Sequence, residues 1–280
     1  LAYTGPSDAT IDLREAPLVG RFAGGYLSRV DGVLGGFTIA HGVVIENAYG
    51  GSGDDRLTGN TADNRLYGGR GADVMAGGGG NDTYRVDDAD DRIVESIRGG
   101  FDTVQSSIDY TLDDHIERLL LTGKAGTGKG NAGTNQLVGN GAANILDGSG
   151  GDDLLDGAAG DDTMLGGAGS DGLLGGAGRD LLDGGSGADF VIYDKSAAAV
   201  LVDLLRGSGF RGDAEGDRLV SIEAVFGSRW NDTLIGGNDR DLFVAAGGND
   251  IAKGARGGDL LQGGDGHDRL YGDDGADNLN

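Results

Sequence analysis

The sequence predicts an all-β solenoid in which nine-residue repeats build two facing sheets. Three observations predict it: a period of nine, glycine at fixed places of each repeat, and one large apolar residue at the eighth place. Residues 148–192 show all three as GSGGDDLLD, GAAGDDTML, GGAGSDGLL, GGAGRDLLD and GGSGADFVI. Nine fits neither a helix nor a plain alternating strand, but it divides into a six-residue turn and a three-residue strand.

The apolar residue at the eighth place is expected to form the core. Side chains alternate faces along a strand, so the eighth residue points inward while the seventh and ninth point outward. One inward side chain per repeat cannot make a core alone, but stacked repeats can. If alternate repeats fall on two sheets, the inward Leu, Met and Val side chains form one narrow core.

The aspartate at the sixth place points to a cation. In a stacked solenoid these aspartates gather at the turns, separated by the strand spacing of about 4.7 Å. A row of like charges at that spacing is repulsive, and a divalent cation between the charges removes the repulsion. Calcium accepts the mixture of carboxylate and backbone carbonyl oxygens that glycine-rich turns expose. The sequence therefore predicts multiple bound Ca²⁺ ions.

Composition narrows the class of partner. The 280 residues include 60 glycines and 6% aromatics, too few large side chains for a broad globular core. A net charge of −24 argues against nucleic acid and anionic membrane, because phosphate binding needs clustered Lys and Arg. The absence of cysteine excludes disulfides and thiolate metal sites. No apolar run is long enough to predict a transmembrane segment.

Breaks in the period divide the chain into six segments. Residues 50–85, 130–192 and 227–280 are expected to form three rolls, residues 1–49 a β-rich lead-in, and residues 86–129 and 193–226 two β-rich interludes. In the lead-in, strands are predicted at residues 9–13 and 37–48, with glycine-rich turns around Gly24–Gly25 and Gly35–Gly36. The chain starts without Met and stops at the ninth place of a repeat, so we expect it to be part of a longer protein.

The three rolls hold seventeen repeats, and every sixth place is Asp or Asn. Asn stands at residues 64, 135 and 144, where a neutral amide makes a poorer calcium ligand than a carboxylate.

The repeat GGxGxDxUx, with U a large apolar residue, resembles the nonapeptide of the RTX (repeats-in-toxin) family. The resemblance implies a right-handed parallel β-roll with calcium between each repeat and the next but one. The first repeat supplies its second and fourth carbonyls and its Asp, and the second repeat supplies its first and third carbonyls and its Asp. Carried over to this chain, one site uses Gly167, Gly169 and Asp171 with Gly184, Ser186 and Asp189.

The same carry-over gives the metal ligands of all three rolls. They are Gly51, Gly53, Asp55, Gly68, Asp73, Asp82, Gly151, Asp153, Gly160, Asp162, Gly166, Gly167, Gly169, Asp171, Gly175, Asp180, Gly184, Ser186, Asp189, Asp232, Asp241, Gly248, Asp250, Gly257, Asp259, Gly263, Asp268, Gly272 and Asp277. At most about eleven sites would form, and their positive charge would nearly cancel the net charge of −24. We therefore expect the rolls to be unfolded without calcium.

A second resemblance is more specific. The phrase TIAHGVVIENAYGGSGDD, residues 38–55, is similar to the start of the roll in serralysin-type secreted metalloproteases. Those enzymes carry zinc on an HExxHxxGxxH helix upstream, whereas this chain has only His41, His115 and His267, without that spacing. We therefore expect no catalytic site in this chain, and the similarity implies that His41 is structural.

The resemblances imply a secreted, extracellular protein of a Gram-negative bacterium. They imply export by a type I secretion apparatus and a parent catalytic domain. Two alternatives remain: the repeat region of a large adhesin or surface-matrix protein, which the three separate rolls favour, or of another RTX enzyme such as a lipase or a polysaccharide-modifying enzyme.

Overall fold

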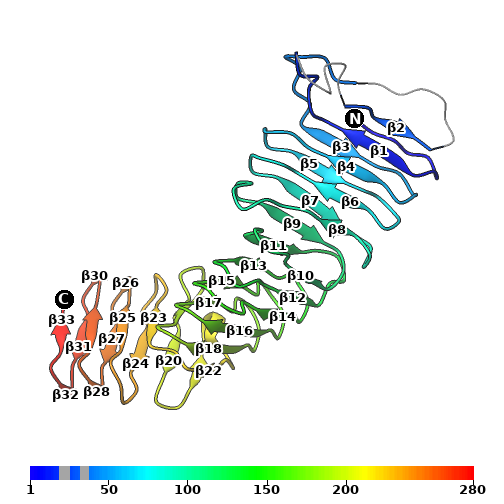
Figure 1. The fold of residues 1–280 in the computed structure, drawn as a ribbon. Coiled ribbons are helices and arrows are strands. Elements are labelled where there is room, and N and C mark those ends of the chain that lie inside the picture. Colours follow the sequence, from blue (N-terminus) through cyan, green and yellow to red (C-terminus); the bar gives the residue numbers. More distant parts are fainter. Residues whose placement is uncertain (19–25, 32–37) are drawn as a thin grey trace. The chain divides into compact units, whose positions relative to one another are not determined.

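The computed structural model describes residues 1–18, 26–31 and 38–280. It contains two compact units, Leu1–Ala125 and Gly126–Asn280. Each unit is a solenoid in which successive short strands fall alternately on two sheets (Figure 1). This confirms the predicted all-β class and the parallel two-sheet solenoid.

In the first unit the two sheets have nearly the same length. One sheet has the order β2 (Arg29–Val30), β1 (Ala9–Asp12), β4 (Arg56–Thr58), β6 (Val74–Ala76) and β8 (Arg92–Ile93). The other runs β3 (Asn47–Tyr49), β5 (Arg65–Tyr67), β7 (Thr83–Val86), β9 (Thr103–Ser106) and β11 (Arg118–Leu121). The short strand β10 (Tyr110–Thr111) lies between β9 and β11 in the chain. All these pairings are parallel except that of β1 with β2.

The second unit has longer sheets. One has the order β12 (Thr127–Lys129), β14 (Ile145–Asp147), β16 (Thr163–Ala168), β18 (Leu181–Ser186), β22 (Arg218–Val220), β21 (Ser208–Phe210), β20 (Leu201–Asp203), β24 (Thr233–Ile235), β27 (Ile251–Lys253) and β31 (Arg269–Tyr271). The other runs β13 (Gln136–Val138), β15 (Leu154–Asp156), β17 (Gly172–Leu174), β19 (Phe190–Ile192), β23 (Ala224–Phe226), β25 (Leu242–Val244), β29 (Leu260–Gln262) and β33 (Asn278–Leu279).

Smaller elements complete the second unit. Two further pairs join turns of the last repeats, β26 (Gly247–Gly248) with β30 (Asp265–Gly266) and β28 (Arg256–Gly257) with β32 (Asp274–Gly275). A 3₁₀ turn, η1, covers Gly212–Ala214. Among the described residues, no helix has the length and apolar character that crossing a membrane requires.

Each turn of the coil contains two nine-residue repeats. Leu155 pairs with Leu173 and Met164 with Leu182, each eighteen residues on. The strands β15 and β17 occupy the seventh to ninth places of their repeats, as predicted. The eighth-place residues Leu155, Met164, Leu173, Leu182 and Val191 are all 0% exposed. The narrow core of inward apolar side chains is therefore confirmed.

The interludes join the same sheets as the repeats. In the first unit, β9 pairs with β7 and β8 with β6, both in parallel. In the second unit, β22 pairs in parallel with β18, and β20 in parallel with β24. Between them, β21 pairs antiparallel with both β20 and β22. Residues 193–226 therefore add an antiparallel excursion while the ladder of repeats continues on either side.

The strands predicted in the lead-in are confirmed over residues 9–12 and 47–48, which lie in β1 and β3. The strand predicted at residues 9–13 is β1. The strand predicted at residues 37–48 is wrong over residues 40–46, because a turn at His41 and Gly42 interrupts it and Val43 donates its N–H to the carbonyl of Ala40 at 3.1 Å. Phe37 and the turns predicted around Gly24–Gly25 and Gly35–Gly36 lie outside the described residues.

Candidate calcium sites

The sixth-place carboxylates form ladders along the turns. Asp171 donates its backbone N–H to Oδ1 of Asp189, eighteen residues on, at 2.8 Å. The same bond, 2.7–3.0 Å long, joins Asp55 to Asp73, Asn64 to Asp82, Asn135 to Asp153, Asn144 to Asp162, Asp153 to Asp171, Asp162 to Asp180, Asp232 to Asp250, Asp241 to Asp259, Asp250 to Asp268 and Asp259 to Asp277. Every aspartate predicted as a ligand is therefore part of a ladder.

The second oxygen of most of these carboxylates is buried without a partner. Oδ2 accepts no hydrogen bond in Asp73, Asp82, Asp153, Asp162, Asp171, Asp180, Asp189, Asp250 and Asp259. These residues are at most 4% exposed. A buried acceptor left unsatisfied costs about 1–3 kcal/mol, and more when it is charged. Rows of such oxygens fit a bound cation, which would satisfy the oxygens and offset their charge.

Backbone carbonyls lie beside these oxygens where glycine stands at the first place. A β-carbon on Gly166 would lie 2.5 Å from Oδ2 of Asp171 and 2.5 Å from the carbonyl oxygen of Gly184. The carbonyls of Gly68, Gly166, Gly175 and Gly272 lie in the same way against the first-place glycine eighteen residues earlier. Carboxylate and carbonyl oxygens are the hard ligands that Ca²⁺ prefers, so the donor set fits calcium.

The structure brings together only some of the ligands that the RTX resemblance implies for the site at Asp171 and Asp189. Asp171 Oδ2 and the carbonyl oxygen of Gly184 meet at the cradle of Gly166. The carbonyl of Ser186 instead accepts the N–H of Gly169 at 3.0 Å. The carbonyl of Gly167 accepts the hydroxyl of Ser186 at 3.4 Å.

The turns are of two kinds, and the second place distinguishes them. In the first two repeats of each roll the second residue has an ordinary φ. Its N–H reaches the sixth-place side chain, as Gly51 does to Asp55, Ser228 to Asp232 and Gly237 to Asp241, at 2.5–2.6 Å. In every later repeat the second residue has a positive φ, at Gly69, Gly78, Ser149, Ala158, Gly167, Gly176, Gly185, Ala246, Ala255, Gly264 and Asp273.

The φ of the second residue decides which carboxylate oxygens lack a hydrogen-bond donor. Where the second residue has a positive φ, its N–H does not reach the side chain of the sixth residue. The Oδ2 atom of that sixth residue then has no donor and, where it is buried, no hydrogen-bond partner. The fourth-place glycines predicted as ligands follow the same division. Gly53 lies in a turn of the first kind, and Gly151, Gly160, Gly169, Gly248 and Gly257 have φ between 101° and 139° in turns of the second kind. Gly263, at a first place, packs its backbone against Oδ2 of Asp268.

Burial makes these carboxylates reluctant to carry charge. Burial first, and nearby carboxylates second, raise the pKa of Asp73, Asp82, Asp153 and Asp180 to about 7. The same causes raise the pKa of Asp250 to about 6. A raised pKa means that these carboxylates bind protons more readily, and a bound divalent cation would replace those protons.

The ladder also uses carboxylates that the sequence reasoning missed. Asp91 accepts the N–H of Asp73, Asp102 that of Asp82, Glu117 that of Asp102, Asp217 that of Asp180 and Glu223 that of Asp189, at 2.7–3.0 Å. All five lie in the interludes; Asp91 keeps the step of 18 residues, whereas the other four follow steps of 15 to 37 residues that hide the period. An acidic residue shortly before a short apolar strand is the signal that remains.

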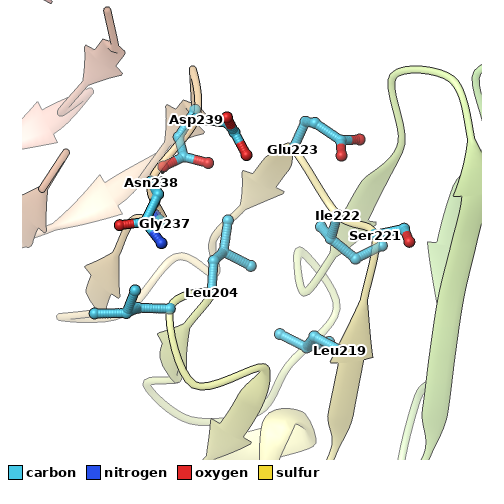
Figure 2. Close-up of a pocket in the computed structure, with 10 residues that line it drawn as sticks. Leu204, Leu219, Ser221, Ile222, Glu223, Gly237, Asn238 and Asp239 are labelled. Carbon is cyan, nitrogen blue, oxygen red and sulfur yellow. Dashed lines mark hydrogen bonds between the residues drawn. The ribbon is translucent and has the colours of Figure 1, made fainter. Parts of the chain in front are cut away.

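Glu223 shows how an interlude meets the next roll. It lines a pocket with Leu204, Leu219, Ser221, Ile222 and the turn at residues 237–239. Figure 2 shows Glu223 and Asp239 at the same rim of this pocket. Burial, together with the charges of Asp259, Asp239 and Glu223, raises the pKa of Asp241, in the same pocket, to about 6. The negative rim therefore extends from the second interlude into the third roll.

Fold and donor set together define a calcium-binding parallel β-roll. The family model described as the RTX calcium-binding nonapeptide repeat (4 copies) matches residues 49–84, 129–164, 156–191, 223–252 and 253–280. These matches cover more than half of the chain, which therefore belongs to the RTX calcium-binding repeat family. No curated protein matches the chain.

Proposed function

We propose that this β-roll region folds when it binds extracellular calcium, and that this folding aids type I secretion of its parent protein and scaffolds the parent's other domain. The observation that carries the proposal is the row of buried carboxylate oxygens without hydrogen-bond partners. These oxygens destabilise the fold unless a cation neutralises them, so binding energy becomes folding energy.

The expected calcium affinity lets the sites stay empty in the cytosol and fill outside the cell. Open sites built from carbonyls and few carboxylates belong with extracellular calcium modules, which bind at about 10⁻⁴–10⁻³ M. At cytosolic calcium such sites stay empty, and the charge of −24 keeps the chain extended for export. At extracellular calcium they fill, and each folded turn offers its neighbour a formed ladder.

We propose a serralysin-like metalloprotease as the parent, on the similarity of residues 38–55 to the start of the serralysin roll. The three separate rolls favour a second candidate, a secreted adhesin or surface-matrix protein. The sequence of the full-length gene distinguishes them. An HExxHxxGxxH motif upstream supports the protease, and a long series of further rolls without that motif supports the adhesin.

Calcium-driven folding is tested by far-ultraviolet circular dichroism of the 280 residues during a titration to about 10 mM calcium, a range that brackets weak modules, with magnesium in parallel. We expect a cooperative transition from coil to β-structure with calcium only. A chain already folded in chelator, or folded equally well by magnesium, contradicts the proposal.

A further inference from the structure

One cluster of carboxylates lies where the first roll meets the first interlude. Asp82 lies in the last repeat of the first roll. Glu95 and Asp102 lie in the interlude that follows, outside the residues that the family model matches. One oxygen of each lies within 4.8 Å of the other two. In the part of the chain that the structure describes, this is the one group of three such side chains that could hold a metal ion.

Two of the three carboxylates are buried with an oxygen unaccounted for. Asp82 is 1% exposed and Asp102 is 0% exposed. Oδ1 of Asp82 accepts the N–H of Asn64, and Oδ1 of Asp102 accepts the N–H of Asp82, both at 2.7 Å. Oδ2 has no partner in either residue. Two buried carboxylate oxygens therefore face the cluster without a hydrogen-bond donor.

The backbone leaves room for an ion at this point. A β-carbon on Gly99 would lie 2.6 Å from Oε2 of Glu95 and 2.9 Å from Oδ2 of Asp102. Glycine here keeps open the space between the two carboxylates. On the other side, the position of a β-carbon on Gly77 is crowded by Oδ2 of Asp82 and the hydroxyl of Tyr84.

The cluster differs from the repeat sites in one ligand. At Gly166 the cradle joins Asp171 to a backbone carbonyl, that of Gly184. At Gly77 the hydroxyl of Tyr84 occupies that place and donates to Oε1 of Glu95. A backbone carbonyl is thus exchanged for a carboxylate that a buried phenol holds in position, and the formal charge of the cluster becomes −3.

We propose that Asp82, Glu95 and Asp102 form a separate calcium site, which binds more tightly than the repeat sites and joins the first roll to the interlude. Calcium affinity rises with the number of charged ligands, and a trivalent lanthanide gains still more from a third carboxylate. The inference rests on the proposed function, because the site forms only when β7 and β9 are folded side by side.

Terbium at trace concentration tests the site in the full chain held folded by about 10 mM calcium, well above the expected affinity of the repeats. Tyrosine absorbs light and transfers energy to terbium nearby, so Tyr84 should sensitise an ion at this site. Three variants are compared with the wild type: Glu95→Gln, Tyr84→Phe and Asp114→Asn. Asp114 is an exposed carboxylate of the same interlude, so its variant controls for the lost charge.

We expect Glu95→Gln to weaken terbium binding about tenfold or more, the effect of about 1.4 kcal/mol from one charged ligand. Tyr84→Phe removes the hydroxyl that positions Glu95, so it should bind less terbium than the wild type, by filtration and metal analysis, and should show much weaker tyrosine-sensitised emission for each ion bound. Asp114→Asn should match the wild type in both.

Equal terbium binding by Glu95→Gln and Asp114→Asn overturns the inference. Circular dichroism at the same calcium concentration shows whether each variant is folded. A wild-type chain that fails to fold with calcium refutes the proposed function instead, so the two failures are distinguishable.

Discussion

Gly166→Ala tests the geometry of a repeat site directly. The new β-carbon would lie 2.5 Å from Oδ2 of Asp171 and from the carbonyl oxygen of Gly184. Favourable contacts of carbon begin near about 3.5 Å, so each oxygen must retreat by about 1 Å. Because Gly166 does not have a positive φ, the backbone itself accepts alanine. The new β-carbon would also lie 2.8 Å from Cβ of Asp171, so the perturbation falls on Asp171 and on the carbonyl of Gly184, which supply the two oxygens that we assign to calcium.

The size of the effect follows from the expected affinity. One site that binds at about 10⁻⁴–10⁻³ M contributes about 1.4–2.7 kcal/mol at about 10 mM calcium. Losing it should lower the free energy of unfolding by that amount and remove one bound ion. Gly150→Ala is the matched control, because its β-carbon would meet nothing closer than the carbonyl of Ala168 at 3.7 Å.

The assay is chemical denaturation followed by circular dichroism at about 10 mM calcium, the upper limit of the titration, with equilibrium dialysis to count bound ions. We expect Gly150→Ala to match the wild type. If Gly166→Ala also matches it in stability and in ions bound, the oxygens around Gly166 do not hold calcium, and the assignment of the ladder as a ligand row is wrong.

Three further predictions concern charge, backbone and core. Lowering the pH from about 8 to about 6 should raise the calcium midpoint, because protons compete at Asp153 and Asp180, whose pKa is raised to about 7. In chelator the sign reverses: the folded-state pKa lies above the unfolded one, so acidification should shift the chain from coil toward β-structure in circular dichroism. A calcium midpoint that does not move with pH contradicts the first statement, and a spectrum in chelator that does not change with pH contradicts the second. Ala158→Gly should stabilise the calcium-bound fold by about 0.5–1 kcal/mol, since Ala158 has φ 70° and relief of that strain exceeds the added chain entropy; a loss of stability in denaturation would count against it. Leu155→Ala, at a core position that is 0% exposed, should cost about 2–5 kcal/mol in the same assay, and a cost below 1 kcal/mol would mean that the core is not closely packed.

The repeating part of the fold was predictable because the large apolar residue at the eighth place of each repeat determines which face of the strand is buried. Leu155 and Met164 are inward because strand alternation leaves the eighth place no other face, and the structure confirms both. The strand predicted across Val43 failed because apolar residues alone do not reveal a turn, and Val43 is 45% exposed.

The candidate sites were only partly predictable, since two features leave no periodic signal. Glu117 and Glu223 enter the ladder after steps of 15 and 34 residues, because one turn of the coil is shorter than the regular turn and the other contains looped-out residues, while both continue the same sheet. Ser149 and Ala158 adopt a left-handed φ that their side chains disfavour, and only the neighbouring turns impose it. Composition therefore identifies the aspartates, while the fold decides which oxygens are left without donors.

The ladder gives the solenoid a chemical polarity. Each bond runs from an amide of an earlier turn to a carboxylate of a later one, as from Asp153 to Asp171 and from Asp171 to Asp189. A coil that grows toward its C-terminal end presents amides and must wait for the acceptor to arrive. A coil that grows toward its N-terminal end presents carboxylates already in place, so the two directions of assembly are inequivalent, like the two ends of a polar filament.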